Sequence, residues 1–163
     1  MVKQFDDSKV GAVGAKSLYP DGTIQHAGVM LEEKRLAVHA LRTWKDDARV
    51  NLNKPCEWNA VTGAFLMTRR NLLEKVGEFD EDNFPIAYND IDYCLKLRDL
   101  GCRILCVNDA RLYHYESASR KSDTLAQIFN RKRYRQFLTE QDCMRKKWKK
   151  EIEHDPYYNC EFV

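Results

Sequence analysis

Two aspartates stand one residue apart in the stretch YNDIDYCLKLRDLG, residues 88–101, in which apolar residues recur at helical spacing. Asn89 is a favoured helix N-cap, Asp92 fits the acidic arm of a capping box, and Asp90 would lie near the positive end of the helix dipole. Either acid could instead serve as a general base. Because successive residues point about 100° apart around a helix axis, at most one of them is expected to face a given substrate. The spacing therefore leaves a structural and a catalytic interpretation open.

Two further residues also have a structural and a functional interpretation. His114 ends an apolar segment, where it could be a histidine bonded within the core or a metal ligand that needs partners. Gly63, in VTGAF, could mark a bulge or a close backbone approach inside a strand. Gly11 and Gly14 do not form a dinucleotide fingerprint, since no helix pattern follows them and their spacing is too short.

The order of periodic segments predicts an α/β fold in which strands and helices alternate. Turn residues, glycines and polar stretches separate the segments. The expected elements are a β-hairpin over 10–19 and 23–31, a long loop over 32–58 with a short element inside it, a buried strand over 59–70, a brief helix ended by Gly77, a helix over 89–101 ended by Gly101, a strand over 102–115, and a helix over 122–152 with one break near Arg133.

Length and composition indicate one globular domain of 163 residues, with an α/β part over 1–122 and a helical extension over 123–163. The first residues lack the apolar run of a secretory signal, so a cytoplasmic location is expected, with the inner face of the cell membrane as a more specific expectation. The six cysteines are scattered, which favours reduced thiols over a disulfide framework. No spacing typical of a structural zinc site is present.

The segment 131–150 contains nine Lys or Arg and two acids, Glu140 and Asp142, with aromatic residues among them. Such a segment could contact nucleic acid or an anionic membrane, or it could be the solvated face of a helix. The net charge of +2 argues against a nucleic-acid partner, because nucleic-acid-binding domains are usually strongly basic. Peripheral membrane contact stays open.

Four segments, taken together and in order, carry a family likeness that extends over residues 9–159. They are VGAVGAKSLYPDGTIQHAGV, AVTGAFLMTRRNLLEKVGEFDEDNFPIAYNDIDYCLKLRDLGCRI, ARLYHYESASR and DPYYN. In sequence and spacing the chain resembles the second half of family 2 glycosyltransferases, most closely the rhamnosyltransferase-like members that build bacterial surface polysaccharides. The resemblance implies part of a GT-A fold, which is a nucleotide-diphospho-sugar transferase fold, with a mixed sheet, flanking helices and a long C-terminal helical segment.

The resemblance also implies roles for individual residues. Asp90 matches the acid that deprotonates the attacking acceptor hydroxyl, and a carboxylate at a helix start is expected to stay ionised near neutral pH. Asn89 stands where many members have Glu, and Asp92 would keep a capping role or support the acceptor. Gly63, next to Thr62, matches a glycine-containing loop beneath the donor sugar. His114 matches a histidine that helps bind the divalent metal, Mg²⁺ or Mn²⁺.

The family's nucleotide-binding strands and Asp-x-Asp metal motif would precede the first residue of this chain. The resemblance thus implies the acceptor-side half of an enzyme that moves a sugar from a nucleotide-sugar donor to a glycan or lipid-linked acceptor, with inversion. The chain alone is expected to turn over slowly or not at all, because the metal's main ligands belong to the other half. The alternative is a non-catalytic glycan-binding or assembly module. Self-association is expected through the sheet edge that would be left open beside the VGAVG strand at residues 10–14.

Overall fold

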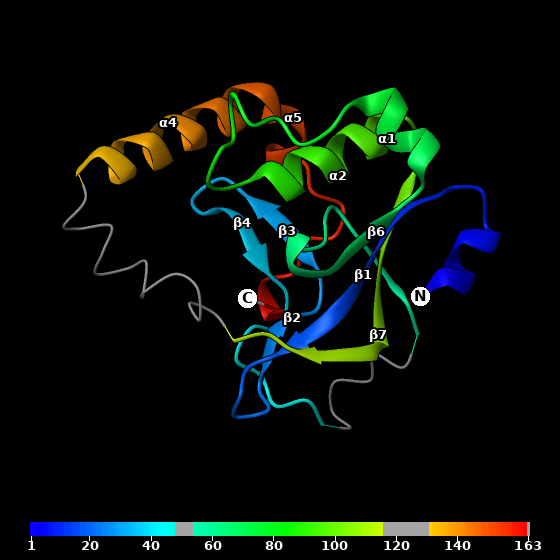
Figure 1. Cartoon of the computed structure of the whole chain (residues 1–163). Coiled ribbons are helices and arrows are strands. Elements are labelled where there is room, and N and C mark those ends of the chain that lie inside the picture. The colour runs from blue at the N-terminus through cyan, green and yellow to red at the C-terminus, as the bar shows by residue number, and fades with distance from the viewer. Residues whose placement is uncertain (48–53, 116–130, 163) are drawn as a thin grey trace.

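The computed structural model describes residues 1–47, 54–115 and 131–162, which form a mixed α/β fold with helices flanking a curled sheet (Figure 1). This confirms the fold class expected from the sequence. The elements are η1 (Val2–Asp6), β1 (Val10–Leu18), β2 (Ile24–His26), β3 (Val29–Glu32), β4 (Leu36–His39), β5 (Cys56–Trp58), η2 (Gly63–Phe65), β6 (Leu66–Thr68), α1 (Arg70–Val76), α2 (Asn89–Asp99), β7 (Arg103–Tyr113), α4 (Arg131–Lys147), α5 (Lys149–Glu153) and η3 (Cys160–Phe162).

Strand β1 is the centre of the main sheet. Its small and β-branched residues are buried at all nine positions, as expected for a strand covered on both faces. It pairs in parallel with β7 on one side and antiparallel with β6 and β2 on the other, and β5 extends the sheet beyond β7. A register shift separates the two halves of the β1–β7 ladder, between Ala15 and Lys16. Such irregularities increase the local bend of a sheet.

The helices gather along one side of the strands, with α1 and α2 beside α4 and α5 (Figure 1). Helix α2 packs on β1 and β7, while α5 packs on β3 of a second, two-stranded sheet formed by β3 and β4. Ile91, Leu95 and Leu97 of α2 share one core with Met144 and Trp148 of the C-terminal segment. The basic segment is therefore attached to the same core through its apolar residues.

The expected hairpin is correct for its first turn but not for its second strand. Residues 23–31 divide at Gly28, so that β2 pairs with β1 and β3 leaves to pair with β4. Gly28 has a φ of +139°, and a Cβ there would lie 2.3 Å from the ring of Trp58. Only glycine allows both this backbone conformation and this approach. The long loop expected over 32–58 contains β4 and β5 among its described residues.

Two other expected elements differ from the structure. The strand expected over 59–70 is interrupted by η2, and only Leu66–Thr68 forms the strand β6. The apolar composition of that run was compatible with a strand, but Thr62 begins a turn by accepting a hydrogen bond from the N–H of Ala64. The helix break expected near Arg133 lies instead at Trp148, between α4 and α5, and residues 122–130 of that helix are outside the described part.

The open edge expected beside residues 10–14 is wrong, because β1 is paired on both sides there. Self-association itself stays a prediction, and so does the division into 1–122 and 123–163. The reason for the correction is that β6 and β7, from later in the chain, supply partners to β1 that a local pattern does not reveal.

Candidate functional site

Asp90 lies in the first turn of α2, and its side chain is only partly buried. Its Oδ2 accepts a hydrogen bond from the backbone N–H of Gly63 at 2.7 Å, and its Oδ1 accepts one from the backbone N–H of Ile91 at 2.9 Å. Among the described residues, these two backbone N–H groups hold the Asp90 carboxylate, and no ion pair to that carboxylate is present. A carboxylate held in this way keeps lone pairs available for a further proton donor.

Burial raises the pKa of Asp90 above its usual value, and the hydrogen bonds from Gly63 and Ile91 oppose that effect. The expectation from the helix start alone was a carboxylate favoured in its charged form. Removal from water outweighs that contribution, because desolvation disfavours the charged form of an acid. A raised pKa makes the carboxylate a better proton acceptor once it is ionised.

The turn at Thr62 and Gly63 faces Asp90 from a segment 27 residues away in sequence. Oγ1 of Thr62 accepts from the N–H of Ala64, which fixes the turn that presents the Gly63 N–H. A Cβ built on Gly63 would lie 3.3 Å from Cβ and 3.5 Å from Oδ2 of Asp90. Glycine therefore allows the backbone to approach the carboxylate, while the expected place of Gly63 beneath a donor sugar stays a prediction.

The residue before the site has an uncommon backbone conformation. Tyr88 is the N-cap of α2 and has φ +63° and ψ −1°, in the left-handed region. Bulky residues in this region cost about 1–3 kcal/mol and cluster at functional sites. The next residue, Asn89, turns its Oδ1 to the N–H of Asp90 at 2.8 Å. The capping box expected from Asn89 and Asp92 is thus wrong, because Tyr88 occupies the cap position and its side chain makes no capping hydrogen bond.

Helix α4 braces the segment that leads into Tyr88. Glu140 is 0% exposed, and its Oε2 accepts from the backbone N–H groups of Ile86 and Ala87 at 3.2 and 2.6 Å. One turn away, Phe137 stacks on the Tyr88 ring at 6.0 Å between centroids, and Gln141 donates to the Tyr88 hydroxyl at 3.3 Å. These contacts compensate the unusual backbone at Tyr88 and so fix where α2 begins.

Asp92 points the other way, into the protein. Its side chain is 0% exposed and accepts a hydrogen bond from Nε1 of Trp148 at 2.8 Å. Lys147 and Lys96 form ion pairs with it at 2.7 and 3.0 Å. The two acids of the opening stretch are therefore separated, since Asp92 links α2 to the C-terminal helices while Asp90 stays near the surface. These contacts occupy Asp92 structurally, so we assign it no substrate contact.

His114 follows the end of β7 and is joined to β2. Its Nδ1 lies 2.9 Å from Oε1 of Gln25, whose amide nitrogen donates to the His114 carbonyl at 3.3 Å. Oε1 can only accept, so the His114 proton is on Nδ1 and the Nε2 lone pair is available. Histidines that bind metals are commonly oriented by a second-shell bond of this kind. His114 thus fits a single metal ligand, although the described residues contain no group of three His, Cys, Asp or Glu that could hold an ion.

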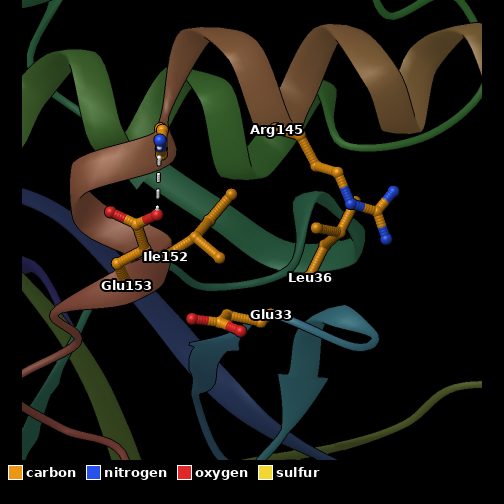
Figure 2. A pocket seen from close by; sticks show the side chains of 6 residues that line it. Glu33, Leu36, Arg145, Ile152 and Glu153 are labelled. Carbon is orange, nitrogen blue, oxygen red and sulfur yellow. Dashed lines mark ion pairs between the residues drawn. The ribbon is translucent and has the colours of Figure 1, made fainter.

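An apolar pocket of about 170 Å³ lies between the β3–β4 turn and the C-terminal helices (Figure 2). Leu36 and Ile152 form its apolar part, and Glu33 and Arg145 stand at its rim. An ion pair between Lys149 and Glu153 crosses its side at 3.7 Å. Its lining shares no residue with the group around Asp90, so this pocket is not where the candidate chemistry lies.

Sequence reasoning missed three residues that shape the site: Tyr88, Glu140 and His26, whose Nε2 accepts a hydrogen bond from the N–H of Thr62. Tyr88 has no sequence signal for a left-handed conformation, since that region favours Gly, Asn or Asp. A glutamate within a basic, amphipathic helix looks solvent-exposed, and only its burial reveals its role. His26 lies in the segment TIQHAGV, whose alternation indicates a strand but does not identify the histidine's partners.

Comparison with known proteins finds two long matches, and no protein-family model matches the chain. A Sinorhizobium fredii protein named uncharacterized protein y4gI is 39% identical over 155 residues, 92% of this chain and 16% of that protein. The O-antigen biosynthesis protein RfbC of Myxococcus xanthus is 36% identical over 129 residues, 77% of this chain and 10% of that protein. The chain therefore spans about a sixth and a tenth of the length of the curated relatives it matches.

None of the helices among the described residues combines the length and the apolar character needed to cross a membrane.

Proposed function

We propose that this chain takes part in bacterial polysaccharide biosynthesis, as the acceptor-side part of a family 2 glycosyltransferase with part of a GT-A fold. The name of the Myxococcus xanthus relative supports the biosynthetic role. The observation that carries the transferase assignment is the Asp90 carboxylate, partly exposed, with a raised pKa, and held by two backbone N–H groups rather than by a cation.

In this proposal Asp90 is the general base. An acceptor hydroxyl donates a hydrogen bond to the carboxylate, and Asp90 takes the proton as that oxygen attacks the anomeric carbon of a nucleotide sugar. The bond to the nucleoside diphosphate breaks on the opposite side, so the configuration inverts. Asn89 and Thr62 stand beside the carboxylate as candidate acceptor contacts, and Gly63 keeps the base in place through its N–H.

The proposed enzyme also needs a divalent metal, Mg²⁺ or Mn²⁺, which would neutralise charge on the leaving diphosphate. His114 is the proposed ligand from this chain, because Gln25 holds its ring with Nε2 available. One neutral imidazole binds such a hard cation weakly, since oxygen ligands suit it better. We therefore expect the remaining ligands to come from a donor-binding half and the isolated chain to turn over slowly.

Calorimetry with a nucleotide sugar and Mn²⁺ tests this assignment, using the chain and its His114→Ala variant. Metal-dependent donor binding that weakens in the variant supports the enzyme. If the chain binds glycan but no nucleotide sugar, and a donor-binding half added to it does not change this, the result supports the non-catalytic glycan-binding or assembly module instead. His154→Ala is a suitable control, because His154 is exposed at the end of α5.

Peripheral membrane contact remains part of the proposal through the exposed cations of α4 and α5. Arg135, Lys146 and Lys150 are exposed on these helices, and such cations are attracted to anionic lipid surfaces by about 1 kcal/mol each. Co-sedimentation with vesicles of increasing anionic lipid content tests it. Binding that does not respond to anionic lipid would contradict the contact.

A further inference from the structure

Two histidines from different sheets meet beneath the turn that supports Asp90. His26, in β2, is 1% exposed, and its Nδ1 lies 2.8 Å from Nδ1 of His39, in β4. The rings meet edge to face, with centroids 5.0 Å apart and planes at 82°. A direct bond between two ring nitrogens requires one to donate and the other to accept.

The other nitrogen of His26 decides which one donates. Nε2 of His26 accepts a hydrogen bond from the backbone N–H of Thr62 at 3.3 Å. An accepting Nε2 has no proton, so the neutral ring carries its proton on Nδ1. His26 therefore donates to His39, and His39 must carry its own proton on Nε2. The contacts thus define one tautomer for each ring.

The Thr62 N–H and the Gly63 N–H are consecutive along the chain. The first donates to His26 and the second donates to Oδ2 of Asp90 at 2.7 Å. The two donors belong to successive peptide groups that are joined at the Cα of Thr62, so a displacement of Thr62 that lengthens the first bond also shifts the second donor. The His26 ring thereby anchors the turn that presents the Gly63 N–H to the carboxylate.

We infer that His26, held in one tautomer between the N–H of Thr62 and Nδ1 of His39, is a positioning residue for Asp90. It acts through the Thr62–Gly63 turn and does not itself contact the candidate substrate-facing group. The inference rests on the proposed function for its catalytic meaning, whereas the coupling from His26 to Asp90 is a property of the fold and can be measured without turnover.

The coupling requires a neutral His26 ring, because a charged imidazole donates from both nitrogens and cannot accept a hydrogen bond. Nε2–H of a charged His26 would face the N–H of Thr62, and that bond would be lost. Burial lowers the pKa of His26 well below its usual value, with a smaller effect from His39. Burial, then Arg42 and His114, lower the pKa of His39 to about 4. Asp90 is joined to the pair through the Thr62–Gly63 turn.

Two substitutions at His26 separate its two contacts. His26→Gln places an amide oxygen near the position of Nε2 and can still accept from Thr62. His26→Asn is too short to reach Thr62 but can still donate to His39 from a position near that of Nδ1. Both remove the ring, so loss of ring packing is common to the pair, and the variants differ in which bond remains, to Thr62 in His26→Gln and to His39 in His26→Asn.

The experiment is NMR on the full chain, with ring ¹⁵N shifts of His26, amide exchange of Gly63 and carboxyl ¹³C titration of Asp90. In the wild type we expect His26 protonated on Nδ1. In His26→Asn we expect the Gly63 amide to exchange about tenfold faster and the pKa of Asp90 to rise, since a donor to its charged form is weakened. His26→Gln is expected to stay within threefold of the wild type in exchange and to keep the Asp90 titration.

The inference is overturned if His26 is protonated on Nε2, or if Gly63 and Asp90 respond equally to both substitutions or to neither. Should His26→Asn not fold, His39→Leu and His39→Asn provide a second pair, because Asn keeps an acceptor near the position of Nδ1 and Leu does not. In His39→Leu the Nδ1–H of His26 has no acceptor, so we expect the bond to Thr62 to weaken and Gly63 exchange to rise there alone, and equal Gly63 exchange in both variants overturns the inference. None of these readouts needs glycosyl transfer, so a failed transferase assignment leaves them interpretable.

Discussion

Gly63 donates its backbone N–H to Oδ2 of Asp90 across 2.7 Å, from the turn that precedes β6 to the first turn of α2. This bond joins two segments that the sequence separates by 27 residues. It also sets the position of the carboxylate on which the proposed chemistry depends. Several measurable consequences come from this relationship and from the contacts that brace it.

Substituting Gly63 by Ala is expected to disturb Asp90 more than it disturbs the fold. The new Cβ would lie 3.3 Å from Cβ of Asp90, which is close enough to displace the neighbour by a few tenths of an ångström. We expect acceptor binding to weaken about tenfold and the free energy of unfolding to change by less than about 1 kcal/mol. Ala64→Ser, at an exposed position in the same turn, is the control. Equal effects of the two substitutions would contradict this account.

Glu140 is expected to stabilise the segment before Tyr88 rather than to act as a surface charge. Glu140→Ala would leave the buried N–H groups of Ile86 and Ala87 without their acceptor. We expect a loss of about 2–3 kcal/mol in the free energy of unfolding, measured in urea. Glu140→Gln keeps an accepting oxygen, so its loss should be clearly smaller. A cost below 0.5 kcal/mol for Glu140→Ala, a size typical of surface sites, would show that the brace is unimportant.

Asp92 is expected to affect stability strongly, because it pairs with two lysines and Trp148 in the interior. Asp92→Ala should cost about 3 kcal/mol. A double-mutant cycle with Lys147→Met should reveal a coupling of about 1 kcal/mol or more between the two side chains. Additive effects within about 0.3 kcal/mol would mean that the ion pair contributes nothing. Asp142→Ala, at an exposed position in α4, is the matched control.

Acid is expected to destabilise the protein through the two histidines. Both have a folded-state pKa below the usual 6.5, well below for His26 and about 4 for His39, so the unfolded chain binds protons more readily. Their contribution is complete above pH 6.5 and is lost as the pH falls from 6.5 towards 4. We expect a decline of about 3 kcal/mol or more over that window in urea unfolding, and a shallower decline in a variant with both His26→Gln and His39→Asn. An identical slope for variant and wild type would refute this.

The sequence was sufficient to predict the elements whose pattern is local. The spacing of the apolar residues Ile91, Leu95 and Leu97 predicted α2 nearly to its ends, and the run at 102–115 predicted β7. The predictions from sequence that failed have a common cause, which is that contacts with distant residues override local signals. Asp92 matches a capping box, but Trp148, 56 residues away, takes its carboxylate into the core. Glu140 reaches Ile86 over 54 residues, and no spacing rule connects them.

The sequence predicted only part of the candidate site, again because segments distant in sequence contribute to it. Asp90 and Gly63 were selected from separate motifs, and the fold brings them into direct contact. The sequence did not predict the histidine pair under Thr62, because the tautomer of His26 depends on a backbone donor from another segment. Nor did it predict Tyr88 in the left-handed region, where packing against Phe137 compensates the backbone cost.

The most direct test of the central claim is the rate of sugar transfer by the chain joined to a donor-binding half, with and without Asp90→Asn. The account predicts that the substitution lowers turnover about 10²-fold or more, the usual contribution of a general base, while acceptor affinity stays within about threefold. Unchanged turnover in the Asp90→Asn protein, with the wild-type fusion active, would contradict the assignment of Asp90 as the base.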